Sequence, residues 1–359
     1  MSLFTLFLPP LIATDISRLH TQYSTSQYCL QEYQEQHGWD KLSSQYQELC
    51  TQEELFNGNI NDPELYTLAG WEYVHGADPT SINPETQPIG KYLLGLSILI
   101  FGTPIVMQYI SLTIILIFTY LISRRIMSKW LAIIPSLFIL SDQLFTTQLI
   151  DPYLDLTTTA LILIYLYFFR RPKLAMVMLG LVALSKSFSL GIILALTSSI
   201  YLLITDRSKI SRYLRLSWIS ILTYLTGYTM FFVYGHNLLD FAQLHLNIIR
   251  LYKSYVPEYP LGEVFRIIFV GQWQEWYGDF SLIKVNDWSF LWPISLAVSF
   301  LALFIKKFRA NKTILLHLTW IIIYLSFISF RLVFPRYLLP ILPSMYIVLT
   351  YCLGKVFVH

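Results

Sequence analysis

Charged side chains are scarce in this sequence, and the scarcity decides its broad class. Only 13% of the 359 residues are Asp, Glu, Lys or Arg, whereas an ordinary soluble domain has about 25%. Hydrophobic residues make up 55% of the chain, and apolar runs recur from residue 92 to the C-terminus. Runs of about 20 residues match the thickness of a bilayer. The composition therefore excludes a soluble enzyme and predicts a multi-pass integral membrane protein.

Cysteine and clustered metal-binding residues are also few. Three cysteines are too few for a disulfide framework, although Cys29 and Cys50 lie in one acidic segment and would pair in an oxidising compartment or stay free thiols elsewhere. No Asp-x-Asp pair or compact His/Cys cluster occurs, so we expect no metal and no cofactor. Because no basic stripe lies outside the short links between apolar runs, nucleic acid is excluded as a partner.

Lys and Arg gather in four short links, and this bias predicts the topology. The links cover 124–129, 170–173, 206–215 and 306–312, and the positive-inside rule places them in the cytoplasm. We expect an all-α bundle of about nine to eleven transmembrane helices, with further helices in the outer interface. The main expected spans are 105–123, 130–149, 152–169, 174–187, 189–204, 213–234, 287–305, 313–330 and 337–356. The first apolar run, 1–13, is too short for an ordinary span, and we expect a short first span with its N-terminus inside.

The whole chain is interpreted as one membrane domain, and two long polar segments share its non-cytoplasmic side. Segment 14–91 carries twelve acids against three bases. Segment 235–286 lies on the same side in this topology. The active face is therefore expected to be extracytoplasmic, in the plasma membrane or its equivalent. The domain, 1–359, divides into the outer loop 14–91, the helices of 92–234, the outer loop 235–286 and the helices of 287–359, and 92–102 is expected to lie in the interface.

Residues 174–204 form a hairpin that is too short for two complete crossings. Both flanks are cytoplasmic, and 31 residues must run out and back where two crossings need about 40. The tip, Ser185-Lys186-Ser187, is therefore expected below the outer surface. A lysine at that depth is costly unless it meets an anion, although a lysine that extends toward the headgroups is the alternative.

The predicted outer face carries a series of polar motifs in a fixed order. An acid pair opens a probable helix, and a proline-rich turn then ends in Pro-x-Gly-Lys. Two further motifs lie at the mouth of a span and at the hairpin tip, and aromatic and basic motifs follow. They are Asn61-Asp62-Pro63-Glu64, Pro88-Ile89-Gly90-Lys91, Ile150-Asp151-Pro152-Tyr153-Leu154-Asp155, Gly180-Leu181-Val182-Ala183-Leu184-Ser185-Lys186, His245, Trp273-Gln274-Glu275-Trp276-Tyr277 and Arg336-Tyr337-Leu338-Leu339-Pro340.

This order of motifs resembles the GT-C class of polyprenyl-phosphate-sugar-dependent glycosyltransferases, and most of all the protein O-mannosyltransferase-like (PMT/ArnT-like) family. The likeness runs from about residue 60 to 345. It departs from the family pattern where Pro63 separates the two leading acids and where a Pro-Pro-Leu element reads Gln87-Pro88-Ile89. The resemblance implies a GT-C-like fold and an inverting hexosyltransferase that moves mannose or another hexose to an acceptor hydroxyl, on protein Ser/Thr or on a glycan or lipid.

The chemistry of that reaction suits the charged residues of these motifs. A sugar on polyprenyl phosphate leaves as a phosphate anion, so the site needs fixed positive charge and a base for the acceptor hydroxyl. We expect catalytic roles for Asp62 as the base, Glu64 as its assistant or replacement, and Asp151. We expect the donor phosphate on Lys91, Lys186 and Arg336. Substrate contacts are expected from Asp155, His245, Trp273, Trp276 and Tyr277.

Each of these residues also has a structural alternative. Asp62 before Pro63 has the pattern of a helix N-cap, and Asp151 and Asp155 share one face of a helix start that either would cap. The tryptophans are typical of an interfacial aromatic belt, and His245 of a packed histidine on an amphipathic stretch.

Two other functional classes fit a membrane bundle. A lipid or ion transporter is disfavoured because no repeat relates the two halves of the chain and because the membrane acids gather at outer ends. A noncatalytic partner subunit is disfavoured because Asp62, Glu64 and Lys91 are all present. The expected partners are membrane lipid, the polyprenyl-phosphate-linked sugar and a protein, glycan or lipid acceptor.

Overall fold

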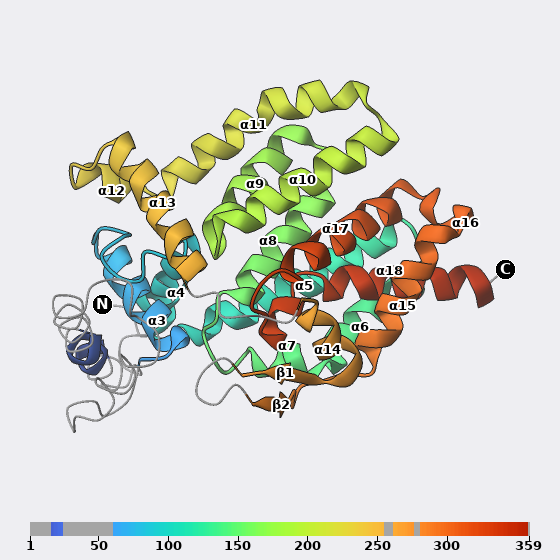
Figure 1. Cartoon of the computed structure of the whole chain (residues 1–359), viewed down its shortest axis with the longest axis horizontal. Helices are drawn as coiled ribbons and strands as arrows, with labels where there is room; N and C mark the ends of the chain where they lie inside the picture. The colour runs from blue at the N-terminus through green and yellow to red at the C-terminus, as the bar shows by residue number, and fades with distance from the viewer. Residues whose placement is uncertain (1–15, 24–59, 255–260, 276–280, 358–359) are drawn as a thin grey trace.

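A computed structural model of the chain describes residues 16–23, 60–254, 261–275 and 281–357. Within those ranges the chain is helical apart from one antiparallel ribbon, which agrees with the expected all-α fold (Figure 1). The helices of the first half are α3 Asp62–Val74, α4 Pro88–Phe101, α5 Ile105–Arg124, η3 Leu131–Ile133, α6 Ile134–Ser141, α7 Gln143–Thr147, α8 Asp155–Phe168, α9 Pro172–Ser185 and α10 Phe188–Thr205. The rest are α11 Ser208–Thr226, α12 Thr229–Val233, α13 Leu238–Ser254, α14 Glu263–Val270, β1 Gln272–Gln274, β2 Leu282–Lys284, α15 Leu291–Phe304, α16 Lys306–Arg309, α17 Lys312–Ile328, η4 Pro335–Leu338 and α18 Leu342–Phe357.

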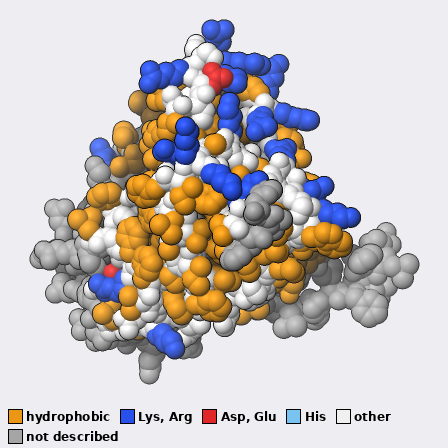
Figure 2. Space-filling view, turned by 90° about the vertical axis from the view of Figure 1, so that its right-hand side faces the viewer, with side chains coloured by type: hydrophobic (Ala, Val, Ile, Leu, Met, Phe, Trp, Pro, Cys, Tyr) orange, Lys and Arg blue, Asp and Glu red, His pale blue; other side chains and the backbone are white. Residues whose placement is uncertain are grey.

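Many helices are apolar, but few are as long as a bilayer is thick. Among the described residues, α5 and α10 are long and apolar enough to cross a membrane. The shorter apolar helices are Pro88–Phe101, Leu131–Ser141, Asp155–Phe168, Pro172–Ser185, Leu291–Phe304, Lys312–Ile328 and Leu342–Val356. Hydrophobic side chains cover much of the face in Figure 2, while Lys and Arg side chains gather at its upper end. On this face the bundle is thus largely apolar below a basic end (Figure 2).

Two predicted spans are interrupted. The span expected at 130–149 breaks at Asp142, whose carboxylate accepts hydrogen bonds from the Leu144 backbone N–H (3.0 Å), from Trp292 Nε1 (2.8 Å) and from the Tyr346 hydroxyl. Because the buried acid takes its partners from two other helices, it ends α6 and begins α7. The span expected at 213–234 ends as α11 at Thr226, and the short α12 follows.

The hairpin predicted at 174–204 is present as α9 and α10. The two helices are joined by only two residues, Lys186 and Ser187. α9 also packs against α8 and α11, and α10 packs against α17. The tight link fixes Lys186 at one end of the hairpin, and the N-terminus of α8 lies at that same end (Figure 1).

Helices α3 and α4 cross in direct backbone contact at Gly70 and Gly95. A Cβ atom at Gly95 would collide with the carbonyl oxygen of Gly70, and one at Gly70 would collide with the carbonyl oxygen of Lys91. Two residues without side chains thus allow a close crossing. It carries the start of α3, where Asp62 lies, toward the rest of the bundle (Figure 1).

Candidate active site

Asp62 occupies the first turn of α3, but it does not cap the helix. Asn61 is the N-cap: its side chain accepts from the Glu64 backbone N–H (3.0 Å), and the Glu64 carboxylate accepts from the Asn61 N–H (3.2 Å). The two residues form a capping box. The capping role considered for Asp62 therefore belongs to its neighbour, and the Asp62 side chain, 48% exposed, makes a different contact.

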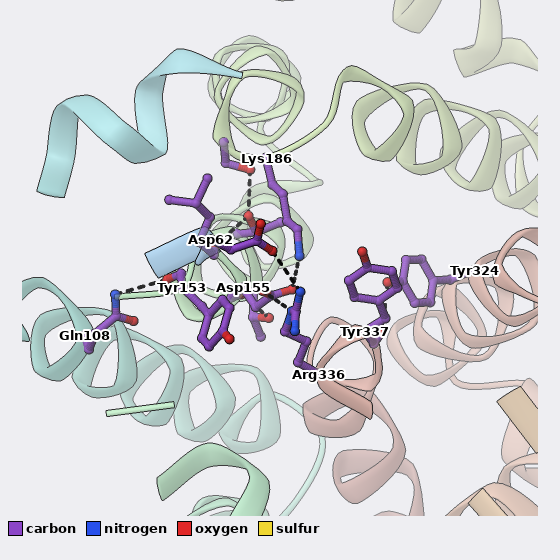
Figure 3. Close-up of polar contacts among 12 residues, drawn as sticks. Asp62, Gln108, Tyr153, Asp155, Lys186, Tyr324, Arg336 and Tyr337 are labelled. Atoms are coloured by element: carbon purple, nitrogen blue, oxygen red, sulfur yellow. Dashed lines mark hydrogen bonds and ion pairs between the residues drawn. The ribbon is translucent and has the colours of Figure 1, made fainter. Parts of the chain in front are cut away.

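That contact is with Arg336, 274 positions further along the chain. Arg336 lies in η4, and its Nη2 atom is 3.0 Å from Asp62 Oδ2. Its Nε atom is 3.7 Å from Oδ2 of a second acid, Asp155, at the start of α8. Figure 3 shows the three side chains pointing toward one another from separate elements. The fold thus joins the first motif of the sequence to the last.

Lys186 completes the group from the tip of the α9–α10 hairpin. Its Nζ atom lies 2.5 Å from Asp155 Oδ1, and its backbone carbonyl accepts from the Gln87 N–H (3.2 Å). Lys186 is 15% exposed and Asp155 only 4%, so this ion pair is largely shielded from solvent. We call Asp62, Asp155, Lys186 and Arg336 the Asp62 cluster.

Aromatic rings surround the two cations of the Asp62 cluster. The Arg336 guanidinium carbon is 4.5 Å from the Tyr153 ring centroid and 4.3 Å from that of Phe334. Lys186 Nζ is 4.4 Å from the Tyr337 ring centroid. Such contacts favour a cation at partly buried positions. The Tyr324 hydroxyl donates to the Tyr337 carbonyl (2.8 Å), which fastens η4 to α17.

The cations retain capacity for an anion. Two cations face two carboxylates, and within the described residues neither Arg336 Nε nor Asp155 Oδ2, both buried, has a hydrogen-bond partner. These two atoms face each other at 3.7 Å, which is beyond hydrogen-bond distance, so Asp155 does not use the Nε donor of Arg336. The cluster thus suits an anion bound by Lys186 and Arg336, beside the exposed carboxylate of Asp62.

Two predicted catalytic acids lie outside the Asp62 cluster. Glu64 belongs to the capping box and forms an ion pair with Arg18 (3.1 Å). Asp151 is exposed and precedes α8 instead of opening it, because the turn in which the Tyr153 N–H donates to the Asp151 carbonyl (2.8 Å) comes first. The expectation that Asp151 and Asp155 share a helix face is therefore wrong.

Lys91 is fully buried and donates hydrogen bonds within the segment between α3 and α4. The sequence predicted instead that its amine binds the donor phosphate. Its amine donates to the Asn83 carbonyl (2.6 Å) and lies 3.4 Å from the Tyr73 hydroxyl. Asn83 has a φ of 52°, in the left-handed region. Because burial removes water from the amine, the pKa of Lys91 falls from 10.5 to about 7. These hydrogen bonds tie Lys91 to the loop before α4.

The predicted substrate contacts from 235–286 are only partly described. His245 packs against Phe241, with its Nε2 atom 2.6 Å from the Tyr224 hydroxyl and its Nδ1 donating to the Phe241 carbonyl (2.8 Å). Burial lowers the pKa of His245. Trp273 lies in β1 and packs on Phe334, with ring centroids 5.3 Å apart. The predicted contacts Trp276 and Tyr277 lie outside the described residues.

Sequence reasoning missed three residues that shape the site. Tyr153 and Phe334 pack on Arg336, and Gln87 accepts from the Tyr228 hydroxyl (2.6 Å) while its N–H holds the hairpin tip. Tyr153 lies inside the motif that ends at Asp155, and Phe334 lies two residues before Arg336, so their positions in the sequence could have indicated both residues. Within the described ranges, no three His, Cys, Asp or Glu side chains gather as metal ligands would.

Comparison with solved structures reveals a shared fold. The chain is similar to the crystal structure of ArnT from Cupriavidus metallidurans in the apo state, with a TM-score of 0.59 and 17% identity over 82% of this chain and 55% of that one. It is also similar to the same protein bound to undecaprenyl phosphate, with a TM-score of 0.55 and 18% identity over 82% and 56% of the two chains. The chain thus spans little more than half the length of ArnT.

These likenesses confirm the expected GT-C-like fold. No family model matches the sequence, and no curated protein matches it either.

Proposed function

We propose that this chain is an integral membrane glycosyltransferase that moves a sugar from a polyprenyl-phosphate donor to an acceptor hydroxyl, with inversion at the anomeric carbon. The observation that carries the proposal is the Asp62 cluster, where a half-exposed carboxylate adjoins two largely buried cations. The ArnT fold and the solved complex of ArnT with undecaprenyl phosphate support a donor of this lipid class.

The proposed reaction uses each charged group of the cluster. The acceptor oxygen attacks the anomeric carbon, the bond from that carbon to the phosphate oxygen breaks, and its electron pair stays on the leaving phosphate. Lys186 and Arg336 stabilise the charge that grows there. Asp62 takes the acceptor's proton, and Asp155 keeps both cations in place from the start of α8.

The location of the cluster supports a reaction on the extracytoplasmic face. α8 begins at Asp155 and ends close to the basic link at Arg170 and Arg171, and α9 runs back from that link to Lys186. The cluster and the link therefore lie at opposite ends of two helices. By the positive-inside rule the basic end faces the cytoplasm, and the Asp62 cluster faces the other side.

The sugar and the acceptor are proposed only by class. A hexose such as mannose fits the resemblance of the motifs, and Ser or Thr hydroxyls of a protein are the first acceptors to try. A glycan or lipid hydroxyl is the alternative acceptor, since the base acts on any hydroxyl that reaches Asp62.

The test measures sugar transfer by the purified full chain in detergent. Radiolabelled sugars on polyprenyl phosphate are offered with Ser/Thr peptides, glycans and lipids to the wild type, Asp62→Asn and Lys186→Met. We expect Asp62→Asn to lose about a hundredfold in kcat while it still binds donor, as removal of a general base predicts. Lys186→Met should raise the KM for the donor, because it removes a phosphate-binding cation.

The control is Asp240→Asn, which removes an exposed acid at the first turn of α13. It should match the wild type. Asp151→Asn tests the remaining predicted acid, and we expect it to keep most activity because Asp151 lies outside the cluster. If no donor binds or reacts, while a lipid or an ion crosses proteoliposomes that contain the chain, the transferase proposal is wrong and the protein is a transporter.

A further inference from the structure

A basic cavity lies at the opposite end of the bundle from the Asp62 cluster. It has a volume of about 480 Å³ and is lined by Arg125, Arg170, Arg171, Tyr167, Phe168 and Thr313, among others. These residues come from the end of α5, the end of α8 with the link to α9, and the start of α17. Three chain segments that are distant in sequence thus form its wall.

The cavity is separate from the proposed active site. Asp155, of the Asp62 cluster, opens α8, and Phe168, of the cavity, ends it. A helix of 14 residues rises about 20 Å. α9 repeats this arrangement in reverse, since it starts just after Arg171 and ends just before Lys186. A ligand in the cavity therefore does not reach the Asp62 cluster.

The arginines are partly held in place, and no acid lines the described walls of the cavity. The Arg125 guanidinium lies 3.5 Å from the Tyr167 ring centroid, and Nη1 donates to the Tyr167 carbonyl (2.7 Å). Arg171 lies 6.0 Å from the Phe168 ring centroid. A guanidinium fixed on a ring keeps outward N–H groups in the fork that matches a phosphate. The wall thus favours an anion with several oxygens.

Apolar side chains line part of the cavity. Ile126 and Phe168 bring apolar surface into the cavity itself. A soluble anion needs only the cations, whereas a phospholipid needs cations for its headgroup and apolar surface for its chains. Both are present side by side.

We propose that this cavity binds the phosphate diester of an anionic phospholipid in the cytoplasmic leaflet. Basic pockets between membrane helices on the cytoplasmic side suit such headgroups, and the volume lies in the range of small-molecule sites. The lipid would tie the ends of α5 and α8 to the start of α17. The proposal depends on the membrane orientation given above, but not on sugar transfer.

The test compares lipid binding and thermal stability of the full chain in detergent. The wild type receives phosphatidylglycerol, phosphatidylcholine or inorganic phosphate at equal concentration. We expect phosphatidylglycerol alone to raise the melting temperature by several degrees and to remain bound after gel filtration, because only it combines a headgroup of net negative charge with acyl chains; an equal effect of phosphatidylcholine, whose ammonium cancels the charge of its phosphate, would overturn the preference for an anionic lipid. An equal effect of inorganic phosphate would overturn the lipid as the ligand, and no effect of any of the three would overturn the site.

A matched pair of double variants separates the cavity from general surface charge. Arg170→Gln/Arg171→Gln removes two cavity arginines, while Arg212→Gln/Arg215→Gln removes two exposed arginines of α11 outside it. We expect the first pair to weaken phosphatidylglycerol binding about tenfold or more and the second pair to bind as the wild type does. Equal losses in both pairs would show attraction by net charge and overturn the site.

Two further measurements separate a loss of lipid binding from misfolding and from a failure of the proposed transferase function. Arg125→Lys keeps the charge but loses the planar fork on Tyr167, so it should weaken binding in a chain that still folds; unchanged binding would contradict the role of Arg125. Because the Asp62 cluster is about 20 Å away, donor turnover by Arg170→Gln/Arg171→Gln should persist if the chain is a transferase. Lipid binding without any sugar transfer would support the cavity and contradict only the proposed function.

Discussion

Asp155 contacts both cations of the proposed active site. Its two carboxylate oxygens face Lys186 at 2.5 Å and Arg336 at 3.7 Å, and the side chain is only 4% exposed. Two cations this close repel each other when no anion lies between them. The Asp155 carboxylate therefore offsets the repulsion between Lys186 and Arg336.

Asp155→Asn should accordingly destabilise the free protein. Loss of one partner from a buried ion pair costs about 3 kcal/mol, so we expect a lower melting temperature in detergent. Undecaprenyl phosphate should restore part of the loss, because its phosphate supplies the missing negative charge. A control with undecaprenol, which lacks the phosphate, should restore nothing. Equal melting temperatures of variant and wild type would contradict this account.

Lys91 predicts a dependence of stability on pH. Lys91 lies in the first turn of α4, and burial lowers its pKa from 10.5 to about 7. The unfolded chain therefore binds the proton of the Lys91 amine more tightly than the folded chain does. Burial of the charged amine lowers the free energy of unfolding by its full amount below pH 7, and this destabilisation disappears as the pH rises toward 10.5. Between pH 7 and 9.5 the melting temperature of the wild type should rise relative to that of Lys91→Met.

The matched control for that experiment is Lys284→Met, which removes an exposed lysine from β2. Its melting temperature should keep a constant offset from that of the wild type across the same range. A constant offset for Lys91→Met as well would contradict a lowered pKa for the buried amine.

At the scale of elements, the crossing of α3 and α4 positions the proposed base. Gly70 and Gly95 allow the two backbones to touch, and α3 carries Asp62 at its first residue. The sequence predicted an interfacial helix near α4 and a helix start near Asp62, because proline and capping signals are local. It did not predict the crossing, because contact between two helices depends on tertiary packing.

Gly95→Ala should therefore reduce activity through α3. A methyl group at this position collides with the Gly70 carbonyl, so the helices must separate and Asp62 must move relative to Arg336. We expect a loss of about tenfold in kcat, as displacement of a catalytic group by a fraction of an ångström predicts, together with a lower melting temperature. Leu99→Ala, on the exposed face of α4, is the control and should keep its kcat.

The sequence foresaw Asp62, Asp155, Lys186 and Arg336 as site residues, and the fold brings them together. It assigned a catalytic role to Asp151 from the resemblance of the motifs and placed Asp151 and Asp155 on one helix face from their spacing, but a turn precedes α8 and leaves Asp151 exposed. The spacing rule is valid only inside a helix, and the first helical residue depends on contacts that the sequence does not display. Such limits are common at helix ends.

On the scale of the whole molecule, the basic links and the Asp62 cluster mark two ends of one bundle. The sequence shows the positive charge directly, because Lys and Arg gather in short links. It does not predict helix breaks such as the one at Asp142, because that break depends on contacts with Trp292 and Tyr346 from distant helices. Short helices such as α8 also differ from the expected spans, since 14 residues rise only about 20 Å. Helix lengths and breaks thus depend on packing, while the orientation that the basic links indicate stays a prediction.

That orientation is testable with two single cysteines in a cysteine-free background. Ser208 lies within the basic link 206–215, at the start of α11, and Ser81 lies in the predicted outer loop between α3 and α4; both are exposed. In right-side-out vesicles a membrane-impermeant maleimide should label Ser81→Cys but not Ser208→Cys, and inverted vesicles should give the opposite pattern. Labelling of both from one side would refute the orientation and, with it, the extracytoplasmic reaction.

The ion pair between Arg336 and Asp62 has a kinetic consequence. Asp62 Oδ2 accepts from Arg336 Nη2 (3.0 Å), so this oxygen is occupied until the guanidinium meets another anion. In the proposed reaction the donor phosphate competes for Arg336 and releases Asp62, so we expect donor to bind first and acceptor second. An unreactive acceptor analogue should then inhibit uncompetitively against the donor, and competitive inhibition would contradict this order. Under this proposal, a contact between two side chains sets the order of substrate binding.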